Sequence, residues 1–237
     1  NNLGITEKEF LNNLTGLTSL HFSNNKVGNL DIIATFKGLN DLELAGVGIT
    51  NTAFLNSLSV LERLDISNNV ALESIDVGPL SKLKYFDARG CKALREVGCF
   101  NSTIEYIDLN ATAVQGLDIV DIPASLKHLD IGNINPSNPQ TALGVITAAL
   151  NDILPKCSNS IEYLNISGNP VISSLKYDNI QYTVLKHLDV SNCSKIEAIS
   201  AITSAVVFID CRYTKIGSLD FLEDVSKLEY LNIAKAD

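Results

Sequence analysis

The sequence predicts an α/β solenoid in which about ten short strands stack side by side into one parallel β-sheet. The main observation is a pattern that recurs along the chain: apolar, two variable, apolar, one variable, apolar, two variable, then a small or polar residue. Ten copies begin at Leu17, Leu39, Leu61, Leu83, Ile104, Leu126, Ile161, Leu185, Val206 and Leu228. The intervals between them are 22, 22, 22, 21, 22, 35, 24, 21 and 22 residues. A period of this length indicates that matching positions of successive copies are neighbours in space.

Each copy has the alternation of a strand with one buried face. In the copy that begins at Leu61, Leu64 and Ile66 alternate with Arg63, Asp65 and Ser67. A period of two is typical of such a strand. The chain must then turn and return on the opposite side, so we expect the strands of successive copies to run parallel.

The ninth position of each copy supports a turn after the strand. These positions are occupied by Asn25, Val47, Asn69, Cys91, Thr112, Ile134, Asn169, Cys193, Thr214 and Ala236. Seven of the ten side chains can hydrogen-bond to the backbone of the turn, whereas Val47, Ile134 and Ala236 cannot. The copies therefore share a turn as well as a strand.

Stretches such as LDISNN, LNISGNP, IDVGPLSKL and LDFLEDVSKLEYL resemble the repeats of the leucine-rich-repeat superfamily. They are most similar to the 22-residue repeats of bacterial internalin-like surface proteins, and the match runs from Leu17 to Ala236. The resemblance implies a right-handed, horseshoe-shaped solenoid with a concave parallel sheet and an irregular or 3-10 convex side. It also implies a non-catalytic module that binds a partner, usually a protein, on the concave sheet. A bacterial surface or extracellular location is implied too; similar repeats in intracellular eukaryotic proteins leave a cytoplasmic location as the alternative.

The continuous repeat favours one domain over 1–237. Residues 1–16 are expected to form an N-terminal capping segment, because Thr6 and Glu9 have the spacing of a capping box. Residues 17–237 hold the ten repeats, the last of them truncated. No polar cap follows Leu231 and Ile233, and the chain begins at Asn1 without an initiator Met or a signal-peptide pattern. We therefore expect the chain to be a piece of a longer protein in which the solenoid continues.

The 35-residue interval predicts an α-helix on the convex side of the sixth repeat. Leu143, Ile146, Leu150 and Ile153 have helical spacing before Pro155. An amphipathic helix over 140–153 is therefore expected to cover the core, with a separate docking role as the alternative.

Composition excludes several classes of partner. The net charge is −9, which gives no electrostatic attraction for nucleic acid or anionic lipid. No apolar stretch reaches the roughly 20 residues needed to cross a bilayer. Cys91 and Cys193 lie four repeats apart, about 19 Å at the usual strand spacing, too far for a disulfide. We interpret the five cysteines mainly as buried free thiols; the separation of Cys99 and Cys157 cannot be deduced from the sequence.

The third position of each repeat places rings on one line of the predicted sheet. From the fourth repeat onward it is occupied by Tyr85, Tyr106, His128, Tyr163, His187, Phe208 and Tyr230. The core is already filled by the fourth and sixth positions, so these rings are expected to face solvent. Such a strip has the composition of a binding hot spot. Packing between neighbouring rings that merely stabilises the sheet is the alternative.

The fifth position carries mostly acids, beside the rings. It includes five consecutive carboxylates from Glu43 to Asp130, then Asp189 and Asp210. One interpretation is that each side chain bonds to nearby backbone. The other is a site for a cation, either Lys or Arg of a protein or a loosely held metal. Arg89 and Arg212, at the seventh position, are expected to neutralise part of this charge.

The second position alternates in sign through six successive repeats, as Glu62, Lys84, Glu105, Lys127, Glu162 and Lys186. Opposite charges on adjacent parallel strands attract each other. We interpret this column as solvated pairing that also opposes slippage of the strands.

No catalytic constellation stands out. Asp side chains on adjacent strands have nearly the spacing of a retaining glycosidase pair. Every repeat offers such a pair on an open, wet sheet, so nothing is expected to raise the pKa of one acid above that of its neighbour. His128 and His187 are two strands apart, too far to share one zinc ion without other ligands. We therefore expect no catalysis, no cofactor and no resident metal.

Three functions remain open at this point. The first is recognition of a protein with basic character by the concave face. The second is binding of carbohydrate by the same face, and the third is a passive spacer. The predicted binding surface consists of Tyr85, Asp87, Arg89, Tyr106, Asp108, His128, Asp130, Tyr163, His187, Asp189, Phe208, Asp210, Arg212 and Tyr230.

Overall fold

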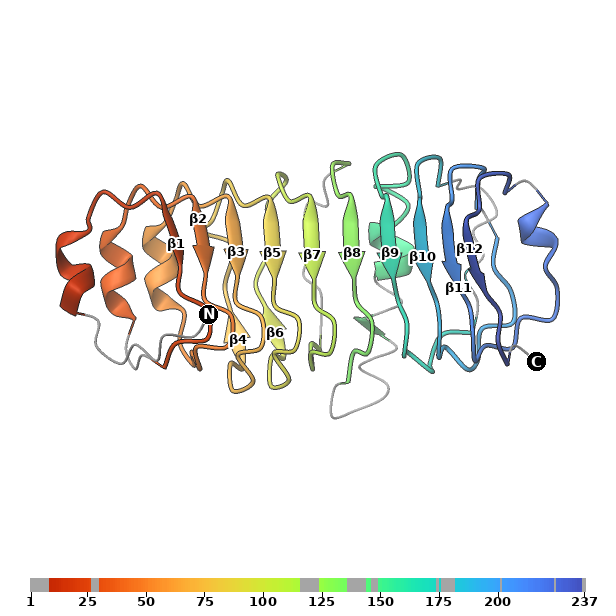
Figure 1. Ribbon diagram of the computed structural model, residues 1–237, viewed down its shortest axis with the longest axis horizontal. Coiled ribbons are helices and arrows are strands. Elements are labelled where there is room, and N and C mark those ends of the chain that lie inside the picture. Colours follow the sequence, from red (N-terminus) through yellow and green to blue (C-terminus); the bar gives the residue numbers. More distant parts are fainter. Residues whose placement is uncertain are drawn as a thin grey trace.

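A computed structural model of the chain describes residues 9–26, 30–115, 124–135, 144–145, 149–173, 175, 182–200, 202–223 and 225–235. Its main feature is a sheet of ten parallel strands, each from one repeat (Figure 1). The strands are β1 (Ser19–His21), β2 (Asp41–Glu43), β3 (Arg63–Asp65), β5 (Tyr85–Asp87), β7 (Tyr106–Asp108), β8 (His128–Asp130), β9 (Tyr163–Asn165), β10 (His187–Asp189), β11 (Phe208–Asp210) and β12 (Tyr230–Asn232). Every neighbouring pair aligns third position with third position, as in Tyr85 opposite Tyr106. The predicted solenoid and its register are confirmed.

The 35-residue interval does not disturb the register. β8 and β9 flank this interval, yet His128 pairs with Tyr163 and Asp130 pairs with Asn165. The two strands therefore pair in the same register as strands separated by an interval of ordinary length.

The core consists of the fourth and sixth positions of the repeats. Leu64 and Ile66 are fully buried, as are Leu188 and Val190 five repeats later. Burying one such side chain contributes about 1.5–3 kcal/mol. Because each repeat covers the next, the core extends along the whole row of strands.

The eighth position of every repeat turns the chain through the left-handed backbone region. Positive φ values occur at Asn24, Gly46, Asn68, Gly90, Ala111, Asn133, Gly168, Asn192, Tyr213 and Lys235. Asn and Gly tolerate this conformation best. Gly90 also has no room for a side chain, because a Cβ there would lie 2.5 Å from Oδ1 of Asn68 in the preceding repeat.

The ninth-position side chains hydrogen-bond to the turns as predicted. Asn69, fully buried, donates from Nδ2 to the carbonyl oxygens of Leu44 at 2.9 Å and Ile66 at 2.6 Å. Its Oδ1 accepts the backbone N–H groups of Gly48 and Ile49. The other six polar side chains at this position bond to a backbone carbonyl in the same way, from Asn25, Cys91, Thr112, Asn169, Cys193 and Thr214.

The side opposite the sheet is built from short elements. Four 3-10 helices lie among the described residues: η1 (Glu9–Asn13), η2 (Asp31–Thr35), η3 (Ala53–Ser57) and η5 (Asp220–Leu222). A small parallel sheet of β4 (Ser74–Ile75) and β6 (Glu96–Val97) was not predicted. The predicted irregular or 3-10 character of this side agrees with these elements (Figure 1).

The α-helix predicted over 140–153 is not confirmed. The described part of that range contains two helical residues at 144–145 and a π-helix, η4 (Ala149–Ile153), whose Ala149 and Ile153 are buried. Residues 140–143 and 146–148 lie outside the described residues. Residues 1–8 of the predicted capping segment also lie outside them, whereas Leu11 in η1 is buried against the core. No helix in the described part of the chain is long and apolar enough to span a bilayer.

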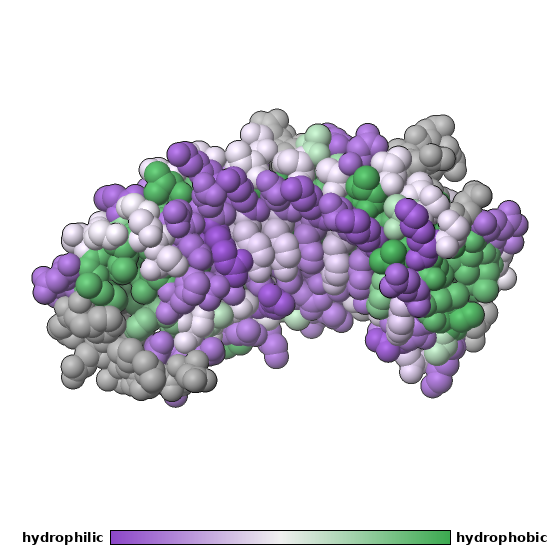
Figure 2. Space-filling view, turned by 45° about the horizontal axis from the view of Figure 1, so that its top comes forward, coloured by the Kyte–Doolittle hydropathy of each residue, from purple (hydrophilic) through white to green (hydrophobic). Residues whose placement is uncertain are grey.

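Core positions are exposed in the last strand. Leu231 and Ile233 have 39% of their surface exposed, whereas Leu188 and Val190 at the same repeat positions have none. Figure 2 shows hydrophobic residues gathered at this end, with hydrophilic residues over the middle of the molecule.

Candidate binding surface

The third-position rings form one continuous stack along the sheet. Successive ring centroids from Tyr85 to Tyr230 are 4.1, 3.9, 4.0, 4.3, 4.0 and 4.4 Å apart. The angles between neighbouring ring planes are at most 15°. We name the seven residues Tyr85, Tyr106, His128, Tyr163, His187, Phe208 and Tyr230 the ring stack. The predicted alignment is therefore present, although six of the rings are half-buried and only Tyr230 is exposed.

The stack reveals the direction of curvature. Neighbouring strands are about 4.8 Å apart, and all six centroid distances are shorter than this. Side chains converge on the inner side of a curve, so the sheet is concave on the face that carries the rings. Arg63 continues the row, with its guanidinium carbon 3.8 Å from the centroid of Tyr85.

The fifth-position acids are more buried than the sequence suggests. Asp87 has no exposed surface, and Asp108, Asp130 and Asp210 have 4–6%. Each accepts the backbone N–H of the residue two positions later, as Asp108 Oδ1 does from Asn110 at 2.9 Å. This geometry supports the interpretation that the column bonds to backbone. The expectation of an open, wet column is wrong for these four residues, because each has at most 6% of its surface exposed.

Arginines neutralise part of the acidic column, as predicted. Arg89 donates to the carboxylate of Asp87, and its Nε lies 3.6 Å from Oδ2 of Asp108. Arg212 Nε lies 3.4 Å from Oδ2 of Asp210. The guanidinium groups themselves remain about half exposed.

Burial changes the pKa values of acids in the fifth-position column. It raises the pKa of Asp108 from 3.8 to about 7, with a further contribution from the negative charge of Asp130. The pKa of Asp130 is also raised by burial, against hydrogen bonds that lower it. The expectation that nothing raises the pKa of one acid above that of another is therefore wrong at Asp108.

The two histidines of the ring stack are held in the neutral form. Burial lowers the pKa of His128 to about 4, and the positive charge of Arg89, like that of His187 when protonated, acts in the same direction. Burial also lowers the pKa of His187. Both rings are therefore uncharged at neutral pH and can stack on their neighbours without a charge.

The alternating charges of the second position pair across strands. Lys84 bonds to Glu62 at 2.8 Å, Lys127 to Glu105 at 2.7 Å and Lys186 to Glu162 at 2.6 Å. These groups lie along one border of the sheet and are exposed, so the interpretation as solvated pairing agrees with the geometry.

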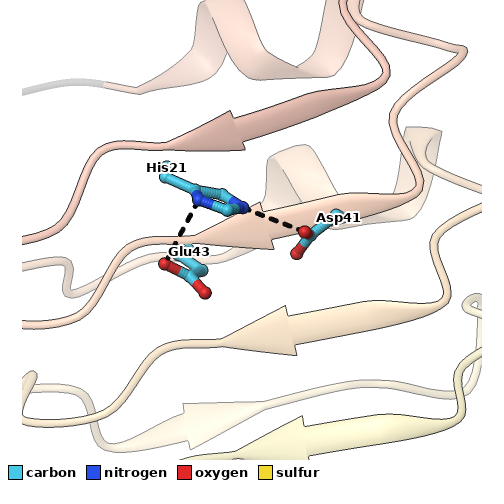
Figure 3. A group of neighbouring side chains, drawn as sticks. All are labelled: His21, Asp41 and Glu43. Atoms are coloured by element: carbon cyan, nitrogen blue, oxygen red, sulfur yellow. Dashed lines mark hydrogen bonds and ion pairs between the residues drawn. The ribbon is translucent and has the colours of Figure 1, made fainter.

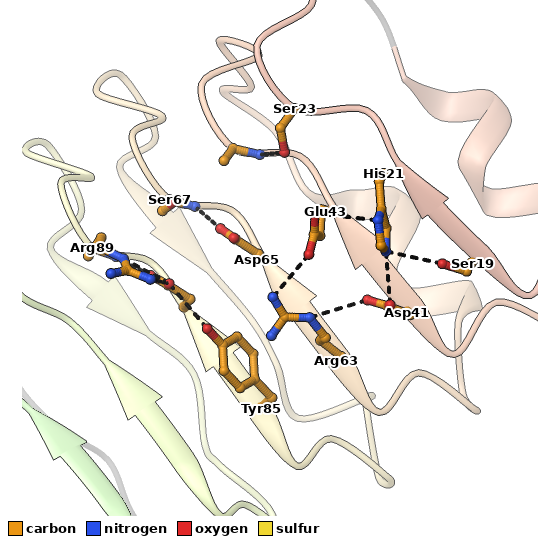
Figure 4. Close-up of polar contacts among 12 residues, drawn as sticks. Ser19, His21, Ser23, Asp41, Glu43, Arg63, Asp65, Ser67, Tyr85 and Arg89 are labelled. Atoms are coloured by element: carbon orange, nitrogen blue, oxygen red, sulfur yellow. Dashed lines mark hydrogen bonds and ion pairs between the residues drawn. The ribbon is translucent and has the colours of Figure 1, made fainter. Parts of the chain in front are cut away.

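A polar cluster at the N-terminal end of the face was not recognised in the sequence. His21 Nε2 lies 2.9 Å from Oδ2 of Asp41, and its Nδ1 lies 3.6 Å from Glu43 (Figure 3). Arg63 reaches the same two acids at 3.4 and 3.0 Å (Figure 4). The alignment of the third and fifth columns brings these residues together. The signal available in the sequence was the change from rings to charged residues at the third position of the second and third repeats.

All fourteen residues of the predicted surface lie on the ring-bearing face, at the third, fifth and seventh positions. The sequence analysis missed the amides beside them. Asn110 and Asn165 each donate to the carboxylate of Asp130 at 2.9 Å. Gly132 leaves the room for them, since a Cβ there would lie 2.7 Å from Nδ2 of Asn110.

A hollow of about 580 Å³ lies outside the predicted surface, at the turns of the fourth to seventh repeats. Thr112, Asn133, Asn169 and Pro170 are among the residues that line it. The residues of the ring stack do not contribute to it, so it is separate from the concave face.

Solved structures with the same architecture are leucine-rich-repeat proteins. The chain is similar to an internalin, inlF, from Listeria monocytogenes strain 4b F2365, with 14% identity over 98% of this chain and 72% of that one, and a TM-score of 0.56. The functional domain of InlJ from Listeria monocytogenes, which includes a cysteine ladder, is 18% identical over 99% of this chain and 62% of that one, with a TM-score of 0.51. The LRIM1/APL1C complex gives 17% identity over 96% of this chain and 46% of that one, also with a TM-score of 0.51.

The chain thus spans less than two thirds of the InlJ domain. No protein-family model and no curated protein sequence matches it. At these identities the similarity establishes the leucine-rich-repeat fold.

Proposed function

We propose that this leucine-rich-repeat solenoid, whose fold is that of the internalins, is a non-catalytic recognition module that binds a protein on its concave face. The observation that supports the proposal best is the unbroken ring stack. Seven rings lie parallel at centroid distances of 3.9–4.4 Å, so the surface is ordered before any partner arrives.

Order in the free state favours binding. Immobilising a flexible side chain at an interface costs about 0.5–1.5 kcal/mol. The rings of the stack are already fixed by their neighbours on both sides, so little of this cost remains. Aromatic side chains also dominate interface hot spots.

The charge of the face favours a basic partner. The third, fifth and seventh columns together contain eight carboxylates, from Asp41, Glu43, Asp65, Asp87, Asp108, Asp130, Asp189 and Asp210. They contain three arginines, Arg63, Arg89 and Arg212. An excess of acid attracts a positively charged surface and accelerates association at low salt.

The stack disfavours the carbohydrate alternative. A sugar that binds to an aromatic side chain lies flat on the face of its ring. Within the stack the ring faces are covered by neighbouring rings, and the outer face of Tyr85 is covered by Arg63. The rings offer mainly their edges, which suit the side chains of a protein. A glycan array separates the two functions, because specific binding of a glycan would support the carbohydrate alternative.

The test uses a double variant, Tyr106→Ala with Tyr163→Ala. Tyr213→Ala is the matched control, because Tyr213 is 45% exposed and lies at a turn outside the stack. The partner is first identified by cross-linking the wild-type chain and is then titrated against purified variants. Circular dichroism confirms that each variant is folded.

We expect the double variant to weaken binding at least 30-fold, the effect of removing a hot spot worth about 2 kcal/mol. The control should keep its affinity. Equal affinity of the double variant and the wild type would reject the concave face as the binding site. If no substitution on this face changes the affinity, a passive spacer would be supported instead.

We also propose display on a bacterial surface, supported by the fold shared with internalins. Four of the five thiols are buried, which protects them from an oxidising exterior. Labelling of the protein on intact cells by an impermeant reagent tests this location, and labelling only after lysis would contradict it.

A further inference from the structure

We propose that His128, Asp108 and Asp130 form a binding site for one divalent transition-metal ion of the zinc type at the middle of the concave face. Each residue offers one ligand atom, and the three atoms lie within 4.8 Å of one another. The proposal goes beyond the proposed function and needs no protein partner.

The ligand types suit this class of metal. One imidazole nitrogen with two carboxylate oxygens is a common donor set for Zn²⁺, with bonds of about 2.0–2.2 Å. Bonds of that length in a tetrahedral arrangement place ligand atoms about 3.4 Å apart. Small side-chain rotations therefore bring the three atoms from their present separation onto one ion. The imidazole favours Zn²⁺ over Ca²⁺ or Mg²⁺, which prefer oxygen ligands.

A second observation, on the side chain of His128, also points to a bound ion. Nε2 of His128 is buried and has no hydrogen-bond partner among the described residues. An unsatisfied buried polar atom is costly, and a metal ion would satisfy it. Tyr106 and Tyr163 stack on the two faces of the ring at 3.9 and 4.0 Å and fix its plane.

The two carboxylates are held in place by a shell of donors. Asp130 accepts Nδ2 of Asn110 and Nδ2 of Asn165 together with the N–H of Gly132, all at 2.9 Å. Asp108 accepts the N–H of Asn110 at 2.9 Å. Metal-binding carboxylates are commonly oriented by hydrogen bonds of this kind. The remaining lone pairs of both groups are available to an ion.

Arg89 is the competing cation. Its short contact is with Asp87, and its Nε lies 3.6 Å from Oδ2 of Asp108. An ion at the site must therefore displace only this weaker contact. Removal of the Arg89 charge is expected to strengthen metal binding.

Two similar places on the same face serve as comparisons. His187 stands beside Asp189 of its own repeat and near Asp210 of the following repeat, but these three do not form such a group among the described residues. His21, Asp41 and Glu43 do form one, yet Arg63 already pairs with both of its acids. The site around His128 combines close ligands with an unpartnered nitrogen.

The experiment titrates the purified chain with ZnCl₂ by calorimetry and with CoCl₂ by visible absorption. All proteins carry Cys99→Ser, because Cys99 is an exposed thiol that would bind zinc by itself. His128→Phe removes the ligand but retains a stacked ring, as Phe208 shows in the same column. His187→Phe and His21→Phe are the controls.

We expect one ion per chain, with affinity reduced at least about 100-fold in His128→Phe and in Asp108→Asn. Both controls should bind as tightly as the parent, and Arg89→Gln should bind more tightly. An unchanged affinity in His128→Phe, or loss in His21→Phe, would overturn the assignment.

If a variant does not fold, the site can still be tested in the unmutated chain. The test is nuclear magnetic resonance of the imidazole nitrogens. Zn²⁺ should shift the His128 resonances and leave those of His187 and His21 in place. A shift confined to His21 would reject the site. Failure of the metal experiment leaves the proposed protein recognition intact, because that proposal is tested with Tyr106 and Tyr163.

Discussion

Asn165 donates its side-chain amide to Oδ2 of Asp130 at 2.9 Å, although the two residues are 35 positions apart in the chain. They occupy the fifth position of adjacent repeats, and both are more than 90% buried. The amide interrupts the row of carboxylates at this point of the column, so a repulsive contact becomes a hydrogen bond.

The Asn165→Asp variant should therefore be destabilised, because an acceptor would replace the donor that faces Asp130. At pH 8 we expect a loss of about 2 kcal/mol in the free energy of unfolding, the usual scale for an uncompensated buried polar group. At pH 5 the loss should be smaller, since one of the two acids can take up a proton. Urea unfolding at both pH values measures this difference. Asn232→Asp is the matched control, because its amide lies 3.4 Å from Asp210 and is less buried; a loss equal to that of Asn165→Asp would contradict the explanation.

The contribution of Asp108 to stability should fall as the pH rises from about 4 to 7. Burial and the charge of Asp130 raise the pKa of Asp108 from 3.8 to about 7 in the folded state. Between these values the folded chain binds a proton that the unfolded chain has released, so raising the pH favours unfolding. The nearby Arg89 lowers this pKa and does not cancel the effect. The lowered pKa of His128 acts in the opposite direction over this range. The contribution of Asp108 is therefore the difference between the slopes of the wild type and Asp108→Asn, measured by unfolding in EDTA from pH 4 to 8. Asp65→Asn, at the same position of the third repeat, should leave the slope in place.

Ala111→Gly should stabilise the chain by about 1 kcal/mol. Ala111 has a φ of 57°, a conformation that costs a residue with a Cβ about 1–2 kcal/mol. Glycine avoids this strain, although it gains entropy in the unfolded chain. Thermal unfolding measures the change. Ala45→Gly is the control at a position without positive φ, where the same substitution should destabilise; stabilisation by both variants would show that strain is not the cause.

Asn69→Ala should cost more stability than Asn169→Ala, by about 1–2 kcal/mol. Both amides donate to turn carbonyls, but only Asn69 also accepts backbone N–H groups, from Gly48 and Ile49. Oδ1 of Asn169 has no partner among the described residues. Chemical unfolding of the two variants in parallel gives the comparison. Equal losses would show that the accepted bonds contribute nothing.

A thiol reagent should label one cysteine of the folded chain rapidly and the other four only on unfolding. Cys99 is exposed, whereas Cys91, Cys157, Cys193 and Cys211 are buried. Burial raises the pKa of Cys91 and Cys211 to about 11 and that of Cys157 and Cys193 to about 12, so little thiolate is present at pH 8. Mass spectrometry after a short exposure counts the labelled sites. Rapid labelling of two or more would contradict the buried positions.

The repeat period was sufficient to predict the sheet and its register. Leu64 and Ile66 recur at fixed spacing because every strand must bury the same face, and a slip of one residue would expose that face. The columns of the third, fifth and second positions follow from the same register. The position of each predicted site residue on the concave face was therefore accessible from the sequence alone.

The convex side was predicted less well, for a physical reason. Elements there are short, and β4 with β6 forms from two residues each, too few for a periodicity to develop. The spacing of Leu143, Ile146, Leu150 and Ile153 indicated an α-helix, whereas the described end of that segment is a π-helix. Packing against the core overrides local propensity in such short elements.

The sequence by itself determined which residues share a strand position, because hydrophobic burial allows only one register. The tertiary structure decided the distances between neighbouring side chains within each column and the extent to which these side chains are buried. Curvature brings the rings to 3.9–4.4 Å, and four acids in the neighbouring column have little or no exposed surface. The raised pKa of Asp108 and the unpartnered nitrogen of His128 both depend on burial, which the pattern along the chain did not predict.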